Sequence, residues 1–273
     1  MKFKAPLVME AIFILIAFLV YAITSNPFFI FNFIYIGTAI AAGVFLMSNN
    51  YKYGRNIIML VVGSYLLFYV SILGHESLSL SGFWYYLFLG VFEAAVIHFL
   101  VAKIIGPFIF GRGWCGYACW TAMVLDLLPY RTPDHERKNW GYVRYLLFAA
   151  VLLYVLALFA LRINNLDEII FYTFIAGNVV YYISGISLAF HLKDNRAFCK
   201  YVCPITVFLK LSSYYSILRI KVNNDKCNEC GKCVKKCPMD VEILNNSRKR
   251  ENGTECILCL NCVNNCPNDA LKI

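Results

Sequence analysis

The strongest constraint on this chain is a cysteine pattern that occurs twice near its end. The pattern C-x2-C-x2-C-x3-C-P begins at Cys227 and returns at Cys256. Its eight cysteines are Cys227, Cys230, Cys233, Cys237, Cys256, Cys259, Cys262 and Cys266. Three thiolates on one tight loop can hold three corners of an iron–sulfur cube, whereas zinc sites use separated ligand pairs and disulfides are typical of secreted chains. The pattern therefore favours iron–sulfur chemistry over zinc binding or disulfide formation.

This doubled pattern resembles the signature of bacterial two-cluster ferredoxins. In that arrangement the fourth cysteine of each run, beside the proline, points away from its own loop and ligates the other cluster. We therefore predict a ferredoxin domain of α+β fold over residues 218–273 that binds two [4Fe-4S] clusters. The expected ligands of the first cluster are Cys227, Cys230, Cys233 and Cys266. Those of the second are Cys256, Cys259, Cys262 and Cys237.

The chain before this tail is apolar enough to cross a membrane several times. The whole chain is 60% hydrophobic and has a mean hydropathy of +0.62, and a helix needs roughly 20 apolar residues to span the hydrocarbon layer. We predict an α-helical polytopic membrane domain over residues 1–217, with six spans at about 7–24, 28–48, 56–74, 82–105, 142–162 and 168–191. No small-residue cleavage site separates the first two spans, which indicates a retained N-terminus and not a signal peptide.

The distribution of charge predicts the orientation of these spans, because Lys and Arg near span ends stay on the cytoplasmic side. With the N-terminus inside, the outer loops carry only Arg162 among basic residues, against Glu76, Asp167 and Glu168. We therefore expect a multi-pass protein of the cytoplasmic membrane, with its N-terminus and its ferredoxin domain in the cytoplasm. Thiols stay reduced there, which suits twelve cysteines used as metal ligands. The net charge of +9 then indicates contact with anionic lipid headgroups, and no nucleic-acid partner is expected.

A second internal repeat contains the four cysteines outside the tail. Its first copy covers residues 112–119 and its second covers residues 196–203. The matching positions are Arg112, Trp114, Cys115, Tyr117 and Cys119 in the first copy, and Arg196, Phe198, Cys199, Tyr201 and Cys203 in the second. Each copy follows an inward-running span and precedes a short apolar stretch. We expect two short cysteine-bearing helices at the cytoplasmic face, related by a pseudo-two-fold axis along the membrane normal.

Cysteines four positions apart on a helix share one face, so each copy supplies two ligands and the repeat supplies four. We expect Cys115, Cys119, Cys199 and Cys203 to hold a third iron–sulfur cluster or another soft metal. The alternative is that they are small residues packed between helices, because free cysteine is among the most buried residue types. The repeated arginine, aromatic and tyrosine positions favour the metal centre. Asp126 follows the first copy and either tunes this centre or reaches the lipid headgroups.

Paired aromatic-Cys-x3-Cys motifs followed by a two-cluster ferredoxin tail resemble the membrane-bound polyferredoxins of the NapH/NosR/CcoG type. The resemblance covers about residues 56–273, and the spans over 7–48 are an addition to its four-span core. Trp120 departs from the family pattern, which has the proline found at Pro204 in the second copy. The resemblance implies electron transfer between a membrane quinone pool or a soluble donor and a partner enzyme or metal centre.

Two ionisable residues lie inside the predicted span 82–105, namely Glu93 and His98. Such residues are functional candidates because they are costly to place in lipid. We expect Glu93 and His98 to bind a quinone or to carry its protons. The alternative is that each is satisfied by pairing with another helix.

Two functions agree with these patterns. The first is an electron-transfer subunit that passes electrons between a soluble ferredoxin or flavodoxin and a membrane acceptor, either the quinone pool or a partner redox enzyme. The alternative is a metallocentre maturation factor or a reductase of a copper-like metal, because soft thiolates suit Cu(I). The scattered methionines favour the first function. The basic run Arg248-Lys249-Arg250 between the two cysteine loops is either a solvated loop or a landing patch for an acidic electron carrier.

Overall fold

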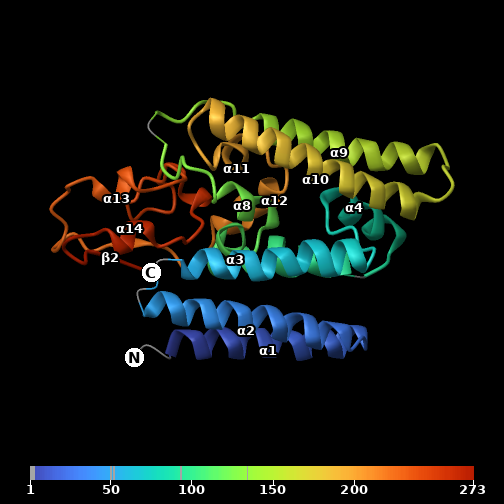
Figure 1. Ribbon diagram of the computed structural model, residues 1–273, viewed down its shortest axis with the longest axis horizontal. Helices are drawn as coiled ribbons and strands as arrows, with labels where there is room; N and C mark the ends of the chain where they lie inside the picture. The colour runs from blue at the N-terminus through green and yellow to red at the C-terminus, as the bar shows by residue number, and fades with distance from the viewer. Residues whose placement is uncertain (1–3, 50, 52, 93, 134) are drawn as a thin grey trace. The chain divides into compact units, whose positions relative to one another are not determined.

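The computed structural model describes residues 4–49, 51, 53–92, 94–133 and 135–273, and helices predominate in it (Figure 1). The chain divides into two compact units, Met1–Gly74 with Tyr117–Met123 and His75–Gly116 with Val124–Ile273. The described residues contain five helices that are long and apolar enough to cross a membrane. These are Pro6–Thr24, Phe28–Ser48, Gly54–Leu73, Val143–Ala160 and Leu166–His191. Five of the six predicted spans therefore coincide with a helix of spanning length.

The first unit is built on a hairpin of α1 (Lys4–Thr24) and α2 (Phe28–Ser48). Its helices approach closely where α2 carries a glycine, because a Cβ added at Gly37 would lie 2.5 Å from the Cβ of Phe13. The hydroxyl of Thr38 donates a hydrogen bond of 3.0 Å to the Glu10 carboxylate across the hairpin. The next helix, α3 (Gly54–Ser64), continues directly into a π-helical segment, η1 (Tyr65–Leu73).

In the second unit, the prediction of one continuous span over 82–105 is wrong. Helix α4 (Leu80–Leu89) ends at Gly90, whose φ of 71° is left-handed, and α5 (Ala94–Phe99), η2 (Leu100–Ile105) and α6 (Gly106–Phe110) follow it. The chain folds back at this break, because the rings of Phe83 and Phe99 lie 4.9 Å apart. A continuous helix would separate these residues by about 24 Å. Leu80 and Val96 complete one buried cluster with the two rings.

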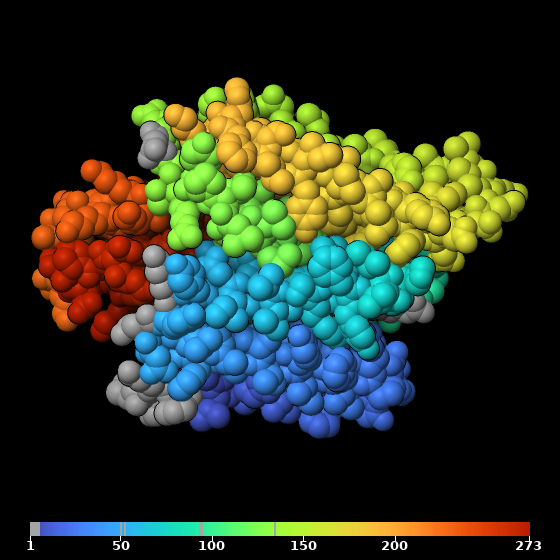
Figure 2. All heavy atoms as spheres, in the orientation of Figure 1, coloured from blue at the N-terminus to red at the C-terminus, as the bar shows by residue number. Residues whose placement is uncertain are grey.

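Helices α9 (Val143–Ala160) and α10 (Leu166–His191) of the second unit lie side by side as an antiparallel pair (Figure 1). Asn165 in the turn before α10 is left-handed, with a φ of 59°, and the Tyr154 hydroxyl lies 2.8 Å from that of Thr173 across the pair. Few side chains of the two helices are fully buried. In the face drawn in Figure 2, no other segment lies over the yellow-green turn that joins them. Apolar surface of this length is what a lipid-facing helix presents.

The cysteine pairs of the second internal repeat do not each lie on one helix, so that prediction is wrong. Cys115 lies in the single-turn helix α7 (Gly113–Tyr117) and Cys199 in α11 (Ala197–Tyr201). Their partners follow the helix ends, where Cys119 precedes α8 (Trp120–Leu125) and Cys203 precedes α12 (Thr206–Ser213). A residue before proline avoids the α conformation, which explains the break at Cys203 before Pro204. The chain breaks at Cys119 as well, although Trp120 follows it.

The tail after α12 is a small α+β fold made of two similar halves, each with one cysteine run, one short helix and one strand. Strands β1 (Lys221–Val222) and β2 (Leu271–Lys272) pair antiparallel, with Val222 opposite Leu271. Between them lie the single-turn helices α13 (Lys232–Lys235) and α14 (Asn261–Asn264), each of which contains the third cysteine of its run. A short 3-10 turn, η3 (Gly253–Glu255), precedes the second run.

Candidate metal centres

Two cavities of the tail are each lined by four cysteines drawn from both runs. One cavity is lined by Cys227, Cys230, Cys233 and Cys266. The other is lined by Cys237, Cys256, Cys259 and Cys262. These are the two sets that the sequence predicts, including the exchange of the fourth cysteine between the runs. Among the described residues, no three His, Cys, Asp or Glu side chains form a group that could hold a single metal ion.

The two loops share a backbone conformation that few side chains adopt. Glu229 and Leu258, at equivalent positions, have φ values of 53° and 51°. Gly231 and Leu260, at the next equivalent pair, have φ values of 71° and 61°. Leucine rarely adopts a positive φ, and such strain persists only where the surrounding structure enforces it. The repetition shows that both loops are bent in the same way around their cysteines.

The fourth cysteine of each run receives the same hydrogen bond. The backbone N–H of Val241 donates to the Sγ of Cys237 over 3.4 Å, and that of Ala270 donates to the Sγ of Cys266 over 3.4 Å. Burial nevertheless raises the pKa of the Cys237 thiol to about 12. Burial, together with Cys259, Cys256 and Cys237, raises the pKa of the Cys262 thiol to about 12. Bound cations deprotonate thiols, so four converging thiols, one of which accepts a backbone N–H, fit an iron–sulfur cluster.

The two copies of the second repeat contact one another through their arginines. Arg112 donates to the backbone carbonyl of Cys199 over 3.3 Å, and Arg196 donates to that of Cys115 over 3.0 Å. Arg112 and Arg196 occupy equivalent positions, as do the two cysteines, so the exchange is reciprocal. Both arginines and both cysteines are buried. The structure therefore brings Cys115 and Cys199 together, and each arginine is tied to the other copy.

Buried charge also surrounds the second copy. Arg196 forms an ion pair of 2.6 Å with Asp126, so Asp126 is a buried partner of this arginine and does not reach the headgroups. Asp194 accepts from the backbone N–H of Arg196 and pairs with Lys200 at 2.7 Å. Ion pairs as buried as these two depend on both of their members, because removal of one member leaves a buried charge uncompensated.

The remaining two cysteines of the quartet lie in different units. Cys203 is half-buried in the second unit, where its carbonyl accepts from the hydroxyl of Thr206 over 2.7 Å. Cys119 is half-buried in the segment Tyr117–Met123 of the first unit. The structure thus brings together one cysteine of each copy, and the four-cysteine centre stays a prediction.

Glu255, which sequence reasoning missed, ties the tail to the helices of its own unit. This residue directly precedes Cys256, and its buried carboxylate contacts four cations. They are Arg112, Arg137 at 3.2 Å, Arg144 at 2.9 Å and Lys210 at 3.5 Å. Burial, followed by Arg144, Arg112 and Arg137, lowers the pKa of Lys210 to about 8. The only sequence signal was a break in the tail repeat, because Lys226 stands at the equivalent position before the first run.

Two further contacts join the same surfaces. The Nζ of Lys200, next to Cys199, lies 2.6 Å from the Asp240 carboxylate in the tail. Gly116, next to Cys115, packs so tightly on the tail that an added Cβ would clash with the carbonyl oxygen of Ile257. The segment around Cys115 therefore lies directly against the segment that follows Cys256.

The predicted quinone residues are placed differently from expectation. Glu93 lies outside the described residues. His98 is buried in α5, and its ring lies 5.2 Å from that of Trp114 in an edge-to-face arrangement. Lys103, also buried, holds its Nζ 5.0 Å from the centre of the Trp114 ring. His98 is therefore a neighbour of the first cysteine motif, and its role toward a quinone stays a prediction.

The basic run after the first cysteine loop is only partly a surface feature. Arg248 and Lys249 are exposed, whereas Arg250 is buried and donates to the carbonyl of Ile220 over 2.9 Å. Arg248 donates to the carbonyls of Tyr214 and Ser216 at 2.9 and 3.1 Å. The expectation of a landing patch made of all three side chains is therefore wrong, because Arg250 is buried, and contact of Arg248 and Lys249 with an acidic carrier stays a prediction.

Known families match two parts of the chain. Residues 219–267 match a 4Fe-4S dicluster domain, and residues 93–132 with 170–224 match a 4Fe-4S binding domain. The second match contains all four cysteines of the repeat at 112–119 and 196–203. No solved structure matches the chain significantly.

Three curated relatives extend these matches. The uncharacterized protein MJ0750 of Methanocaldococcus jannaschii is 31% identical over 171 residues, which are 56% of this chain and 69% of that protein. The methylamine utilization ferredoxin-type protein MauN of Paracoccus denitrificans is 25% identical over 52% of this chain and 55% of its own length. The putative electron transport protein YccM of Escherichia coli is 35% identical over 18% of this chain and 14% of its own length.

The folds and the matches together define a class: an iron–sulfur protein with 4Fe-4S ferredoxin-type domains and several apolar helices of spanning length. The chain belongs to the same family as MJ0750. The narrower resemblance to the NapH/NosR/CcoG type stays a prediction.

Proposed function

We propose that the chain is a membrane-bound electron-transfer protein that connects a soluble carrier in the cytoplasm with an acceptor in the membrane. The donor would be a ferredoxin or flavodoxin, and the acceptor would be the quinone pool or a partner redox enzyme. The names of YccM and MauN, an electron transport protein and a ferredoxin-type protein, support this class of function. The five apolar helices support a place in the cell membrane.

Twelve cysteines would hold the redox groups in three sets of four. The first set is Cys227, Cys230, Cys233 and Cys266; the second is Cys256, Cys259, Cys262 and Cys237; the third is Cys115, Cys119, Cys199 and Cys203. When bound, iron–sulfur clusters supply one-electron oxidation and reduction without a substrate pocket. The cavities lined by the first two sets support this assignment.

The observation that carries the proposal is the direct contact between Gly116 and Ile257. Gly116 follows the proposed ligand Cys115, and Ile257 follows the proposed ligand Cys256. Because these two backbone segments are packed against each other, the third set would lie close to the second. Glu255 holds this contact together from the tail side through its ion pairs with Arg112 and Arg144. These buried ion pairs would hold the tail rigidly in position.

The reciprocal arginines have a second role in the proposal. Arg112 and Arg196 place positive charge beside the backbone of Cys199 and Cys115. Positive charge and hydrogen bonds near thiolates stabilise the more reduced, more negative state of the group they hold. The two arginines would thus raise the reduction potential of the third set relative to a site without them.

The test uses the full chain in proteoliposomes that contain a menaquinone analogue. Reduced flavodoxin is added outside, and the absorbance of the tail and the redox state of the quinone are followed anaerobically. We expect Cys199→Ser to leave reduction of the tail unchanged and to abolish reduction of the quinone. Val180→Ala, at an exposed position of α10, is the control. Quinone reduction at the wild-type rate in Cys199→Ser would contradict the proposal.

A further inference from the structure

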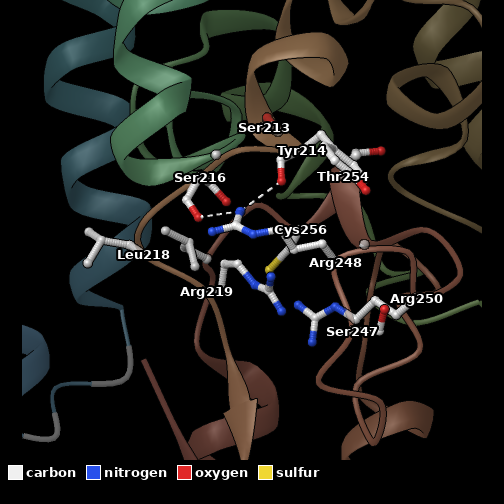
Figure 3. Close-up of a pocket in the computed structure, with 13 residues that line it drawn as sticks. Ser213, Tyr214, Ser216, Leu218, Arg219, Ser247, Arg248, Arg250, Thr254 and Cys256 are labelled. Atoms are coloured by element: carbon white, nitrogen blue, oxygen red, sulfur yellow. Dashed lines mark hydrogen bonds between the residues drawn. The ribbon is translucent and has the colours of Figure 1, made fainter.

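A third cavity of the second unit is lined by three arginines and a single cysteine, and no Asp or Glu is among its lining residues. It lies between the end of α12, the segment 216–219 that leads to β1 and the loop 247–258 (Figure 3). Arg219, Arg248 and Arg250 extend their side chains into the same space (Figure 3). The function proposed above does not use this cavity.

The protein holds each of these arginines by neutral groups only. Arg219 donates to the carbonyl of Asn246, Arg248 to those of Tyr214 and Ser216, and Arg250 to that of Ile220. Among the described residues, none of the three arginines forms an ion pair with a carboxylate. Burial, then Arg250 and Arg248, lowers the pKa of Arg219. The three like charges therefore repel one another, and an anion between them would relieve the repulsion.

A buried hydroxyl in the same cavity points to a ligand independently of the charges. Ser213 is only 6% exposed and lines the cavity, and its Oγ has no hydrogen-bond partner among the described residues. A buried hydroxyl without a partner costs free energy. An oxygen-rich anion would accept from this hydroxyl and from the arginine forks at once, and arginine matches phosphate in a bidentate geometry.

Exposed apolar side chains lie beside the cavity. Ile217 and Leu218 run along α6, because their N–H groups donate to the carbonyls of Phe108 and Ile109 at 2.9 and 2.8 Å. Ile217 is 71% exposed and Leu218, which also lines the cavity, is 37% exposed. Phe108, Ile109 and Tyr215 are exposed too, and the rings of Phe108 and Tyr215 stack. An apolar strip next to an anion site suits a molecule with an anionic head and acyl chains.

We propose that this cavity binds the phosphate headgroup of an anionic phospholipid, whose chains lie along the apolar strip. Arg219 and Arg248 hold the phosphate, and Ser213 donates to it. Arg250 contributes charge, although its main role is to support the loop through Ile220. Because Cys256 also lines the cavity, the lipid would place negative charge beside the second cysteine set of the tail.

The test measures lipid retention by the full chain in native mass spectrometry. Detergent-purified protein is titrated with phosphatidylglycerol or with phosphatidylcholine of the same acyl chains. We expect one phosphatidylglycerol to bind about tenfold more tightly than phosphatidylcholine. Arg219→Gln and Arg248→Gln should each remove this preference, and Arg248→Lys should keep part of it.

Lys249→Gln is the matched control, because it removes the same charge from the same loop and Lys249 does not line the cavity. Equal binding of the two lipids by the wild type, or an equal loss of binding in Lys249→Gln, would overturn the proposal. So would occupation by inorganic phosphate that phosphatidylglycerol does not displace, because the site would then take a free anion. Loss of flavodoxin binding in Arg219→Gln with lipid binding intact would reassign the cavity to an acidic protein partner.

Discussion

Arg196 donates a hydrogen bond of 3.0 Å to the carbonyl oxygen of Cys115, a residue that lies 81 positions earlier in the chain. Arg112 makes the equivalent bond to Cys199. Equivalent arginines of an internal repeat thus each bind the cysteine backbone of the other copy. This exchange makes Cys115 and Cys199 neighbours, and each buried arginine finds a hydrogen-bond acceptor in the other copy.

We expect Arg196→Gln to destabilise the protein by about 3–5 kcal/mol, because it breaks the buried ion pair between Arg196 and Asp126. The measurement is thermal or denaturant unfolding in detergent, with the double variant Arg196→Met, Asp126→Leu as the comparison. The double variant should lose less stability than the single one, since both charges are gone. Arg131→Gln, at an exposed position, is the control. A single variant as stable as this control would show that the buried pair contributes nothing.

Glu255→Gln should loosen the tail from the helices of its unit. The change leaves Arg112 and Arg144 buried without a countercharge, and desolvated cations are costly in that state. Amide hydrogen exchange should rise by at least tenfold in the segment 111–116 and in the segment that follows Cys256. Glu251→Gln, which changes an exposed carboxylate of the same loop, should leave exchange in both segments unchanged. The same pattern in both variants would contradict the role of Glu255.

Lys210 predicts a dependence of stability on pH. Its pKa is lowered from 10.5 to about 8 in the folded protein, so between those values the unfolded chain binds more protons, and stability rises with pH through this group. Lys210→Met removes the penalty of the charged amine beside Arg144, Arg112 and Arg137. The variant should therefore melt at a higher temperature than the wild type at pH 7, and the difference should shrink by pH 10. A difference that grows with pH would have the wrong sign.

Gly116→Ala should separate the two proposed redox segments. Its methyl group would meet the carbonyl oxygen of Ile257, so the backbone must move apart. We expect electron transfer from the tail to a membrane acceptor to slow by tenfold or more, while reduction of the tail by dithionite stays unchanged. Gly177→Ala in α10, where an added Cβ meets nothing within 4 Å, should transfer electrons at the wild-type rate. Equal rates in the two variants would leave Gly116 without a role in the transfer.

Local patterns predicted most of the spans and grouped the tail cysteines as they line the two cavities, but they did not predict the long-range contacts. Hydropathy located the helices α1, α2 and α10, because lipid-facing segments must be apolar along their whole length. It failed at residues 82–105, where composition stays apolar although Phe83 packs on Phe99 across a fold-back. Glu255 was missed for another reason. Its partners stand more than 40 positions away in the chain, and no local pattern shows that a carboxylate in a polar loop will be buried.

The proposed electron route depends on whether the cysteine repeat at 112–119 and 196–203 holds a third cluster. The most direct measurement is the iron and acid-labile sulfide content of the anaerobically purified full chain, compared with its Cys115→Ser, Cys199→Ser double variant. Three [4Fe-4S] clusters would give about 12 iron atoms per chain, and the double variant should fall to about 8 with the tail spectrum intact. About 8 iron atoms in both proteins would contradict the account and leave Cys115 and Cys199 as packing residues.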